Sequence, residues 1–357
     1  MIGFLQSGVA FVFVLGVLIF IHELGHFIVA KRVGIRVDAF SLGFPPNIFA
    51  RKWRGTEYRI GIIPLGGYVK MAGENPDEKV TGSPDEFMSK SVGQRFLVIF
   101  AGPLMNYLFA VALSVLVLMA FGARVADTSS AVIGSVIQAS PAEEAGLQAG
   151  DVVLAVNGQP VGSFDSMAAR IHPLEGQPVV LTWAHGSDTL TEEISTRPTP
   201  VINEDGTIDT VSLIGVGPAY GFHSMSIGDA LTTGFVEANL KVALTAHFAY
   251  RLIVGEESIR NVGGPVFIAQ ASGEMARRGL YYVLSLMILL SVNLAVLNIL
   301  PIPVLDGGQL AFLGIEVVRR GPLSAKTRMI AQQVGVVMIL SLILVVFYND
   351  IMRLFTG

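Results

Sequence analysis

Residues 1–26 read MIGFLQSGVAFVFVLGVLIFIHELGH, so 21 residues without a charged side chain run directly into two histidines and a glutamate. A spanning helix needs about 20 predominantly apolar residues, and this stretch therefore predicts a transmembrane segment. It has neither a positively charged start nor a small-residue cleavage site, so we expect a permanent membrane helix rather than a cleaved signal peptide.

The composition of the chain favours a membrane protein. Of the 357 residues, 52% are hydrophobic and 15% are charged, whereas about 25% are charged in an ordinary soluble protein. A mean hydropathy of +0.61 excludes a soluble globular enzyme and a disordered or fibrous chain. The net charge of −4 offers no basic excess, so we expect no nucleic-acid partner. Cysteine is absent, which excludes disulfides and cysteine-ligated metals.

Three further stretches lack charged residues and predict three more transmembrane helices: 96–122, 279–305 and 329–348. Lysine and arginine are concentrated in two of the connections between these helices. There are 11 in residues 31–95, 4 in the short connection 306–328 and only 8 in the long connection 123–278. Because cytoplasmic loops carry the positive excess, we expect the first and third connections inside and the long middle connection outside.

The first connection carries strand signals at Val37–Leu42, Glu57–Ile63 and Tyr68–Met71, and Pro64–Gly67 is typical of a turn. We expect a small β-rich loop that lies against the bilayer and offers a strand edge to an extended peptide. In the middle connection, Phe235–Ile253 mixes apolar and charged residues, which favours an amphipathic helix on the outer surface.

The sharpest chemical signal is His22-Glu23-Leu24-Gly25-His26. Positions i and i+4 share one face of a helix, so both imidazoles can reach one metal ion, with Glu23 beside them as a base. The alternative is a pair of histidines satisfied within a core. Three ionisable side chains on adjacent turns of a membrane helix are costly unless they line a functional cavity, which disfavours that alternative.

A zinc site of this kind needs a third protein ligand. The other histidines, at 172, 185, 223 and 247, all fall in the outer connection, whereas His22 and His26 lie at the inner end of the first helix. Asp306 is the carboxylate at matching depth, within NILPIPVLDGG at 298–308. The two prolines there break the helix and free backbone groups, which is tolerable where the chain lines a cavity. The alternative is an exposed aspartate at a helix end.

Ile133–Gly158 reads IGSVIQASPAEEAGLQAGDVVLAVNG and resembles the PDZ domains of bacterial envelope proteases. The pattern is a strand, a short helix from Pro141, a turn and a second strand. A helix near Asp165–His172 and a strand at Val179–Trp183 continue it. The resemblance implies a domain that binds an extended peptide or a C-terminus by strand addition, and a structural spacer is the alternative.

Together with the PDZ-like region, the HELGH motif and the Asn298–Asp306 motif resemble the site-2 protease family of intramembrane zinc metalloproteases, in its bacterial branch. The runs Gly67–Met71 and Gly102-Pro-x-x-Asn106 are also similar. The resemblance implies Zn²⁺ held by His22, His26 and Asp306, with Glu23 as general base and acid and Asn298 as an orienting group. It also implies that the β-rich loop presents the substrate as an added strand, and we expect this contact at Gly66, Gly67, Tyr68 and Val69.

The same resemblance implies regulated intramembrane proteolysis in a bacterial stress response. The expected substrate is a transmembrane anti-sigma factor, or a remnant signal peptide, cleaved within the lipid bilayer. The expected location is the bacterial inner membrane, with the PDZ domain periplasmic and the zinc site toward the cytoplasm. The chain has room for one PDZ domain, whereas the best-known enterobacterial member has two, and this puts a shared gating mechanism in doubt.

The expected fold is a multipass α-helical membrane protein with four transmembrane helices, an inserted α+β PDZ domain and a small membrane-associated β-rich loop. The expected segments are helix 1 (1–30), the cytoplasmic loop (31–95), helix 2 (96–122), the PDZ domain (123–200), a linker with an amphipathic helix (201–278), helix 3 (279–310), a cytoplasmic loop (311–328), helix 4 (329–348) and a tail (349–357). The alternative functions are a proton or metal transporter and a non-catalytic adaptor that displays the PDZ domain.

Overall fold

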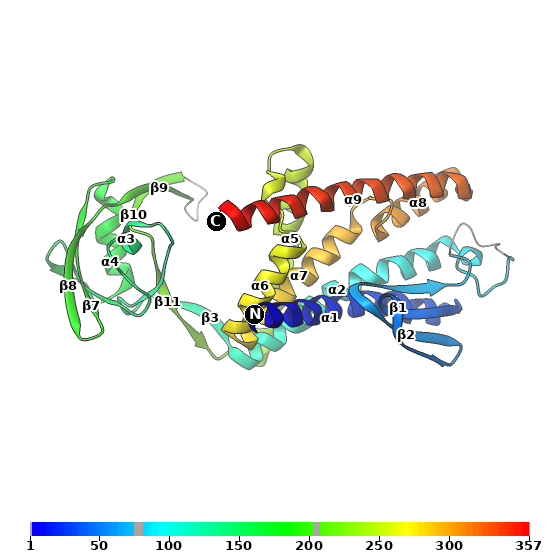
Figure 1. Ribbon diagram of the computed structural model, residues 1–357, viewed down its shortest axis with the longest axis horizontal. Helices are drawn as coiled ribbons and strands as arrows, with labels where there is room; N and C mark the ends of the chain where they lie inside the picture. Colours follow the sequence, from blue (N-terminus) through cyan, green and yellow to red (C-terminus); the bar gives the residue numbers. More distant parts are fainter. Residues whose placement is uncertain (1, 75–80, 203–207, 357) are drawn as a thin grey trace. The chain divides into compact units, whose positions relative to one another are not determined.

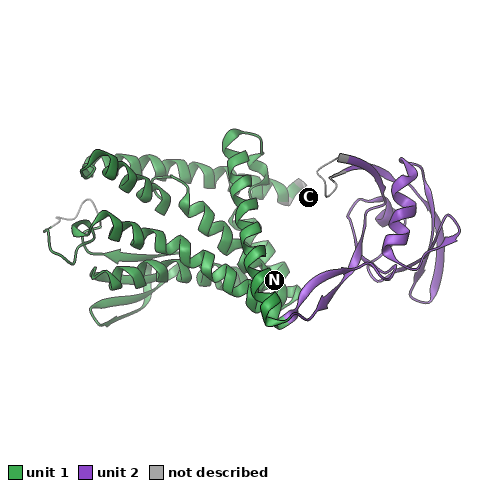
Figure 2. Cartoon of the chain, turned by 180° about the vertical axis from the view of Figure 1, so that it is seen from behind, with its two compact units in different colours: residues 1–120, 226–357 green, residues 121–225 purple. Residues whose placement is uncertain are grey.

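The computed structural model describes residues 2–74, 81–202 and 208–356, and the chain divides into two compact units (Figures 1 and 2). Unit 1 comprises residues 1–120 and 226–357, and unit 2 comprises residues 121–225. The elements of unit 1 are α1 (Ile2–Arg32), β1 (Val37–Trp53), β2 (Thr56–Met71), α2 (Val92–Phe121), α5 (Ile227–Val254), α6 (Pro265–Arg278), α7 (Leu280–Ile299), α8 (Asp306–Arg319) and α9 (Ala325–Thr356).

Four of the described helices are long and apolar enough to cross a membrane: Gln6–Arg32, Val92–Phe121, Leu280–Ile299 and Ala325–Arg353. They coincide with the four stretches without charge, extended at their ends by flanking polar residues. The third is the exception, because α7 ends at Ile299, whereas the sequence predicted a helix through residue 310. Pro301 and Pro303 cannot donate backbone hydrogen bonds, so the chain leaves the helix there and starts α8 at Asp306.

β1 and β2 form a hairpin whose tight turn lies at Arg54 and Gly55, both with positive φ. The register pairs Ala39 with both Lys70 and Glu57, so the start of β1 has β2 on both of its sides. β2 therefore changes direction between its two halves, within a single long strand. The predicted turn at Pro64–Gly67 falls where this change occurs, because Ile60 and Gly67 both pair with Leu42, although the residues between them are part of β2.

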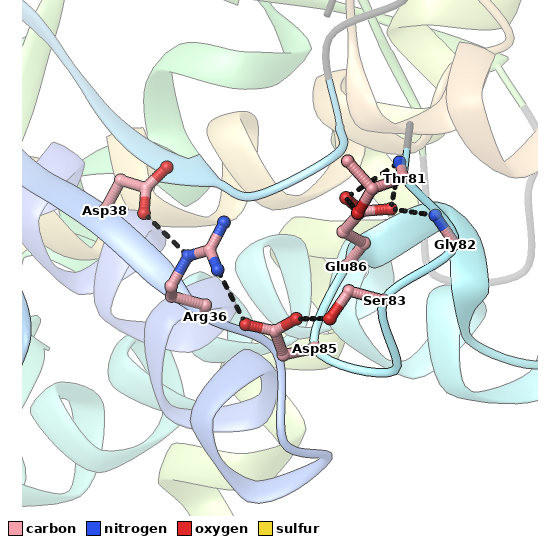
Figure 3. Close-up of polar contacts among 7 residues, drawn as sticks. All are labelled: Arg36, Asp38, Thr81, Gly82, Ser83, Asp85 and Glu86. Carbon is pink, nitrogen blue, oxygen red and sulfur yellow. Dashed lines mark hydrogen bonds and ion pairs between the residues drawn. The ribbon is translucent and has the colours of Figure 1, made fainter. Parts of the chain in front are cut away.

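The loop that leads into α2 is held by charged side chains (Figure 3). Arg36 bridges Asp38 and Asp85 at 3.2 and 2.8 Å. Glu86 accepts hydrogen bonds from the side chain and the backbone N–H of Thr81 and from the backbone N–H of Gly82. The Thr81 hydroxyl, followed by its backbone N–H, lowers the pKa of Glu86 below its usual range. These bonds order the chain just before α2 begins.

Unit 2 is an α+β unit. Its strands are β3 (Ala123–Asp127), β4 (Ile133–Val136), β5 (Val152–Val156), β6 (Gln159–Pro160), β7 (Val179–His185), β8 (Asp188–Ile194), β9 (Arg197–Ile202), β10 (Ile208–Leu213) and β11 (Val216–His223), and its helices are α3 (Pro141–Glu144) and α4 (Phe164–Ile171). One sheet has the order β6-β5-β7-β8, and β11 lies between β3 and β4 in another. The fully buried Trp183 lies in the core of the unit. The strands and helices expected between residues 133 and 183 are confirmed.

The boundary of unit 2 lies farther along the chain than residue 200. β11 pairs with β3 through Ala219 and Asp127 and with β4 through Val216 and Val136, so its residues complete a sheet of this unit. Residues 201–225 therefore belong with unit 2 and not with the linker in which the sequence placed them. The amphipathic segment Phe235–Ile253 lies within α5, which runs across the direction of α9 in unit 1 (Figure 1).

Candidate metal centre and active site

The α1 helix places His22 and His26 one turn apart near its C-terminal end, with Glu23 directly after His22. The helical i, i+4 spacing brings the Nε2 atoms of the two imidazoles to 3.2 Å, and the ring planes stand nearly perpendicular at 83°. His26 is only 8% exposed. Two ring nitrogens that converge inside an apolar helix pair need either a shared proton or a cation between them.

Asp306 approaches these rings from the opposite side. Its Oδ2 atom lies 3.1 Å from Nε2 of His22 and 3.5 Å from Nε2 of His26. The close turn between α7 and α8 makes this approach possible. A Cβ atom at Gly307 would lie 2.1 Å from the Ile299 carbonyl oxygen, and one at Gly308 would lie 2.2 Å from that of Ile302. Only glycine fits at both positions, so the DGG sequence positions the carboxylate.

The donor set fits a zinc ion. Ligand atoms of His22, His26 and Asp306 all lie within 4.8 Å of one another, and two imidazoles with one carboxylate form a known zinc-hydrolase set. The buried Oδ2 of Asp306 accepts no hydrogen bond within the described part of the chain, although two ring nitrogens face it. His26 Nδ1 lies 2.8 Å from the Val98 carbonyl, which can only accept, so the proton is on Nδ1 and the Nε2 lone pair faces the centre.

The α2 helix leaves room for the rings through a glycine. A Cβ atom at Gly102 would lie 2.2 Å from Nε2 of His26 and 2.8 Å from Cε1 of His22. Gly25, inside the HELGH motif, allows α1 to approach α2 equally closely, because a Cβ there would meet the Ala101 carbonyl oxygen at 2.2 Å. The glycines of the two helices therefore create the space in which the three ligand atoms meet.

A cavity of about 320 Å³ opens beside the three ligand atoms. Its lining residues are His22, Glu23, His26, Gly67, Tyr68, Val69, Met71, Glu74, Ile99, Asn298, Val304, Leu305, Asp306 and Gln309. The structure thus brings Glu23 and Asn298 to the same cavity from α1 and from the last turn of α7. A volume of this size admits a short extended peptide segment together with water.

Three of the four residues expected to contact substrate line this cavity, namely Gly67, Tyr68 and Val69. A Cβ atom at Gly67 would come within 3.1 Å of Cγ of Glu23, so this part of β2 lies directly against the proposed base. Gly66 does not line the cavity, and a Cβ there would instead meet the Phe44 ring at 2.3 Å. Its role is close packing within the hairpin.

The structure adds cavity residues that the sequence did not single out, among them Glu74 and Gln309. Burial raises the pKa of the Glu74 carboxyl to about 7. Asn106 was noted only within a family-like run, yet its side chain contacts His22 at 3.2 Å. A signal for Asn106 was present, because it is the only amide or charged residue between Phe96 and Gly122.

A second cavity of about 370 Å³ shares Tyr68, Met71, Glu74, Ile99 and Gln309 with the first. Its wall contains a buried ionic cluster in which Glu316 of α8 pairs with Arg95 of α2 and Arg328 of α9. The cluster joins three helices around the space next to the candidate site.

Comparisons with known proteins identify the family of the chain. Peptidase family M50 matches residues 10–342 of the chain. A protein of Agrobacterium fabrum that is named as a zinc metalloprotease is 33% identical over 371 residues, covering 99% of this chain and 97% of the relative. Zinc metalloprotease RasP of Geobacillus kaustophilus is 30% identical over 433 residues, covering 99% of this chain and all of the relative.

Among solved structures, the PDZ domain of an SdrC-like protein from Listeria monocytogenes matches 25% of this chain and 85% of its own, with 25% identity and a TM-score of 0.20. The family match and the two relatives span nearly the whole chain, and the relatives' names imply zinc. The chain therefore belongs to Peptidase family M50, the site-2 protease family, and is a zinc metalloendopeptidase with apolar helices suited to a membrane.

Proposed function

We propose that the chain cleaves peptide bonds inside a membrane at a zinc ion held by His22, His26 and Asp306. The observation that carries the proposal is the convergence of three ligand atoms within 4.8 Å around a buried carboxylate oxygen that accepts no hydrogen bond from the described residues. Zinc, when bound, supplies a Lewis acid that polarises the scissile carbonyl and lowers the pKa of water.

The other cavity residues divide the remaining work. Glu23 takes a proton from the attacking water and then delivers it to the leaving amine, as a general base and acid. Asn298 donates its amide N–H to the carbonyl oxygen of the substrate. Gly67, Tyr68 and Val69 hold the substrate as an added strand, which suits a peptide that must be extended to be cut.

The substrate is a transmembrane segment, because the site lies among apolar helices. Such a segment must first unwind, since helical carbonyls are hydrogen-bonded within the helix. The chemistry suits the membrane anchor of an anti-sigma factor after external trimming, and also remnant signal peptides. This substrate class agrees with a role in regulated intramembrane proteolysis during a stress response.

The proposed membrane topology rests on the distribution of lysine and arginine along the chain. Lysine and arginine are dense in residues 31–95 and 306–328 and sparse in 123–278, which supports a four-span protein of the bacterial inner membrane with unit 2 in the periplasm and the zinc site toward the cytoplasm. The residues expected to form a PDZ domain, 123–200, would bind a peptide or a C-terminus.

The β1–β2 hairpin exposes large apolar side chains that suit contact with lipid: Ile48, Phe49, Trp53, Ile60, Ile62 and Ile63.

The test uses purified full-length protein in vesicles with a single-span substrate. Glu23→Gln should keep its zinc but lose at least about 10²-fold in cleavage rate, because an amide cannot act as a base. Glu256→Gln, at an exposed carboxylate outside the cavity, is the matched control and should cleave normally. A zinc chelator should abolish cleavage by the parental protein.

Two outcomes would overturn the proposal. Near-parental cleavage by Glu23→Gln with zinc bound would remove Glu23 from the mechanism. Zinc movement across the vesicle membrane without any cut in the substrate would favour the transporter alternative.

A further inference from the structure

Asn106 lies fully buried on α2, beside the first of the two imidazoles. Its Nδ2 atom is 3.2 Å from Nδ1 of His22, the ring nitrogen that points away from the three converging ligand atoms. Its Oδ1 atom has no hydrogen-bond partner among the described residues. A buried amide oxygen without a hydrogen bond lowers the stability of the fold, so the position of this side chain requires an explanation.

The two orientations of this carboxamide have opposite consequences for His22. If Nδ2 donates to Nδ1, the proton of the neutral ring must sit on Nε2, and Nε2 then has no lone pair for a cation. If the amide is turned so that Oδ1 faces the ring, Nδ1–H donates to it and the Nε2 lone pair points at Asp306. The ends of an amide are similar in shape, so the chemistry of the neighbours decides between them.

The neighbours favour the turned orientation. His26, the partner imidazole, already donates Nδ1–H to the Val98 carbonyl, which leaves its Nε2 free. Nε2 of His22 lies 3.1 Å from Asp306 Oδ2, an atom without a hydrogen bond from any described residue. When zinc occupies this centre, Nε2 of His22 must present its lone pair to the ion instead of a proton. The proton is therefore better placed on Nδ1, facing Asn106.

The backbone of Asn106 is also fixed in place. Ser291 of α7 donates its hydroxyl to the Asn106 carbonyl oxygen at 2.8 Å. Asn106 therefore contacts α1, which carries His22 and His26, and α7, which leads into the turn before Asp306.

We propose that Asn106 is a positioning residue, whose carboxamide oxygen accepts Nδ1–H of His22 and so fixes the tautomer and ring orientation that presents Nε2 to zinc. This inference rests on the proposed zinc site. Groups that orient a metal-ligating histidine in this way typically contribute about 10- to 100-fold to metal affinity.

The experiment measures zinc affinity of the full-length protein in detergent by competition with a chromophoric chelator. Asn106→Leu, which neither accepts nor donates, should bind zinc about 10- to 100-fold more weakly. Asn106→Asp, which can only accept, should bind at least as tightly as the parent. Ser114→Ala is the matched control, because Ser114 is a buried polar residue on the same helix without a hydrogen-bond partner in the described chain. It should bind as the parent does.

Each alternative has its own outcome. Weak binding by both Asn106→Leu and Asn106→Asp would show that the amide acts as a donor and would overturn the inference, provided that the metal-free variants melt at the parental temperature. Parental affinity of Asn106→Leu would overturn it as well. His22→Ala separates this failure from failure of the proposed site, because zinc retention in that variant would refute the site itself.

Discussion

At the scale of single residues, Gly102 of α2 leaves the space that the imidazole ring of His26 occupies. Gly102→Ala would place a methyl group 2.2 Å from Nε2 of His26, so the ring must turn away from the centre. We expect this variant to lose most of its bound zinc and its activity while retaining its helices. Gly93→Ala on the same helix is the control, because nothing lies within 4 Å of its added Cβ. Zinc per protein, measured by atomic emission, tests the pair, and equal values would contradict the account.

Asp306 and Asn298 line the same cavity but have different proposed roles. Asp306→Ala should lose both zinc and activity, since it removes a ligand. Asn298→Ala should keep near-parental zinc and lose about 10²-fold in cleavage rate, typical of a donor to a developing oxyanion. Metal analysis alongside cleavage of the same single-span substrate tests both variants. If both lose zinc equally, the ligand and the orienting group have been confused.

At the scale of elements, α2, α8 and α9 are joined by the buried carboxylate of Glu316, whose side chain is 2% exposed. It pairs with Arg95 at 2.8 Å and also with Arg328. Glu316→Gln would leave two arginines without their counter-charge, and breaking a buried pair in this way costs about 3 to 5 kcal/mol. We expect a large fall in the melting temperature in detergent. Glu274→Gln, whose partners are solvent-exposed, should cost less than about 1 kcal/mol.

The loop before α2 predicts a dependence on pH. The pKa of Glu86 is lowered by the hydroxyl and N–H of Thr81. The ionised carboxylate therefore stabilises the loop at pH values above the usual pKa of a glutamate. This stabilisation disappears as the pH falls through the lowered pKa. Thr81→Val removes the hydroxyl, so the loop should open at a higher pH than in the parent. Hydrogen exchange of residues 81–90 from pH 7 to pH 3 measures this, and an unchanged midpoint would contradict it.

At the scale of the whole molecule, the pairing of β3 with β11 shows where unit 2 can be removed. Asp127 and Ala219 are cross-strand partners, so residues 128–218 can be replaced by a two-residue Asn-Gly turn that keeps the β3–β11 ribbon. If unit 2 selects substrates by access, this deletion should keep zinc and cleavage of a trimmed substrate. It should also allow cleavage of a substrate whose outer domain is intact.

A cleavage assay with both substrates and both proteins tests this prediction. An unchanged preference for the trimmed substrate would place the selection outside the deleted residues, for example in α5. Loss of zinc from the deletion variant would instead mean that unit 2 is needed for the fold of the metal centre.

The sequence by itself determined the features that depend on local spacing. Four uncharged stretches have the length of spanning helices, and His22 and His26 share a helical face. Pro301 and Pro303 indicated a break in the helix, although the expected segment ran on to residue 310 and α7 ends at Ile299. Each of these follows from helix geometry or from the missing proline N–H, which act within a few residues. The order and length of the segments also predicted that Asp306 faces His22 and His26, and its Oδ2 atom lies 3.1 and 3.5 Å from their Nε2 atoms.

Only the tertiary structure decided which distant residues meet. Asn106 contacts a histidine 84 positions away, Gly102 leaves the space for two rings, and residues 39–42 have β2 on both sides. The extension of unit 2 to residue 225 depends on β11 closing a sheet begun almost 100 residues earlier. None of these contacts has a local periodicity, because each arises when helices or strands pack and a side chain on one element fills the space left by another.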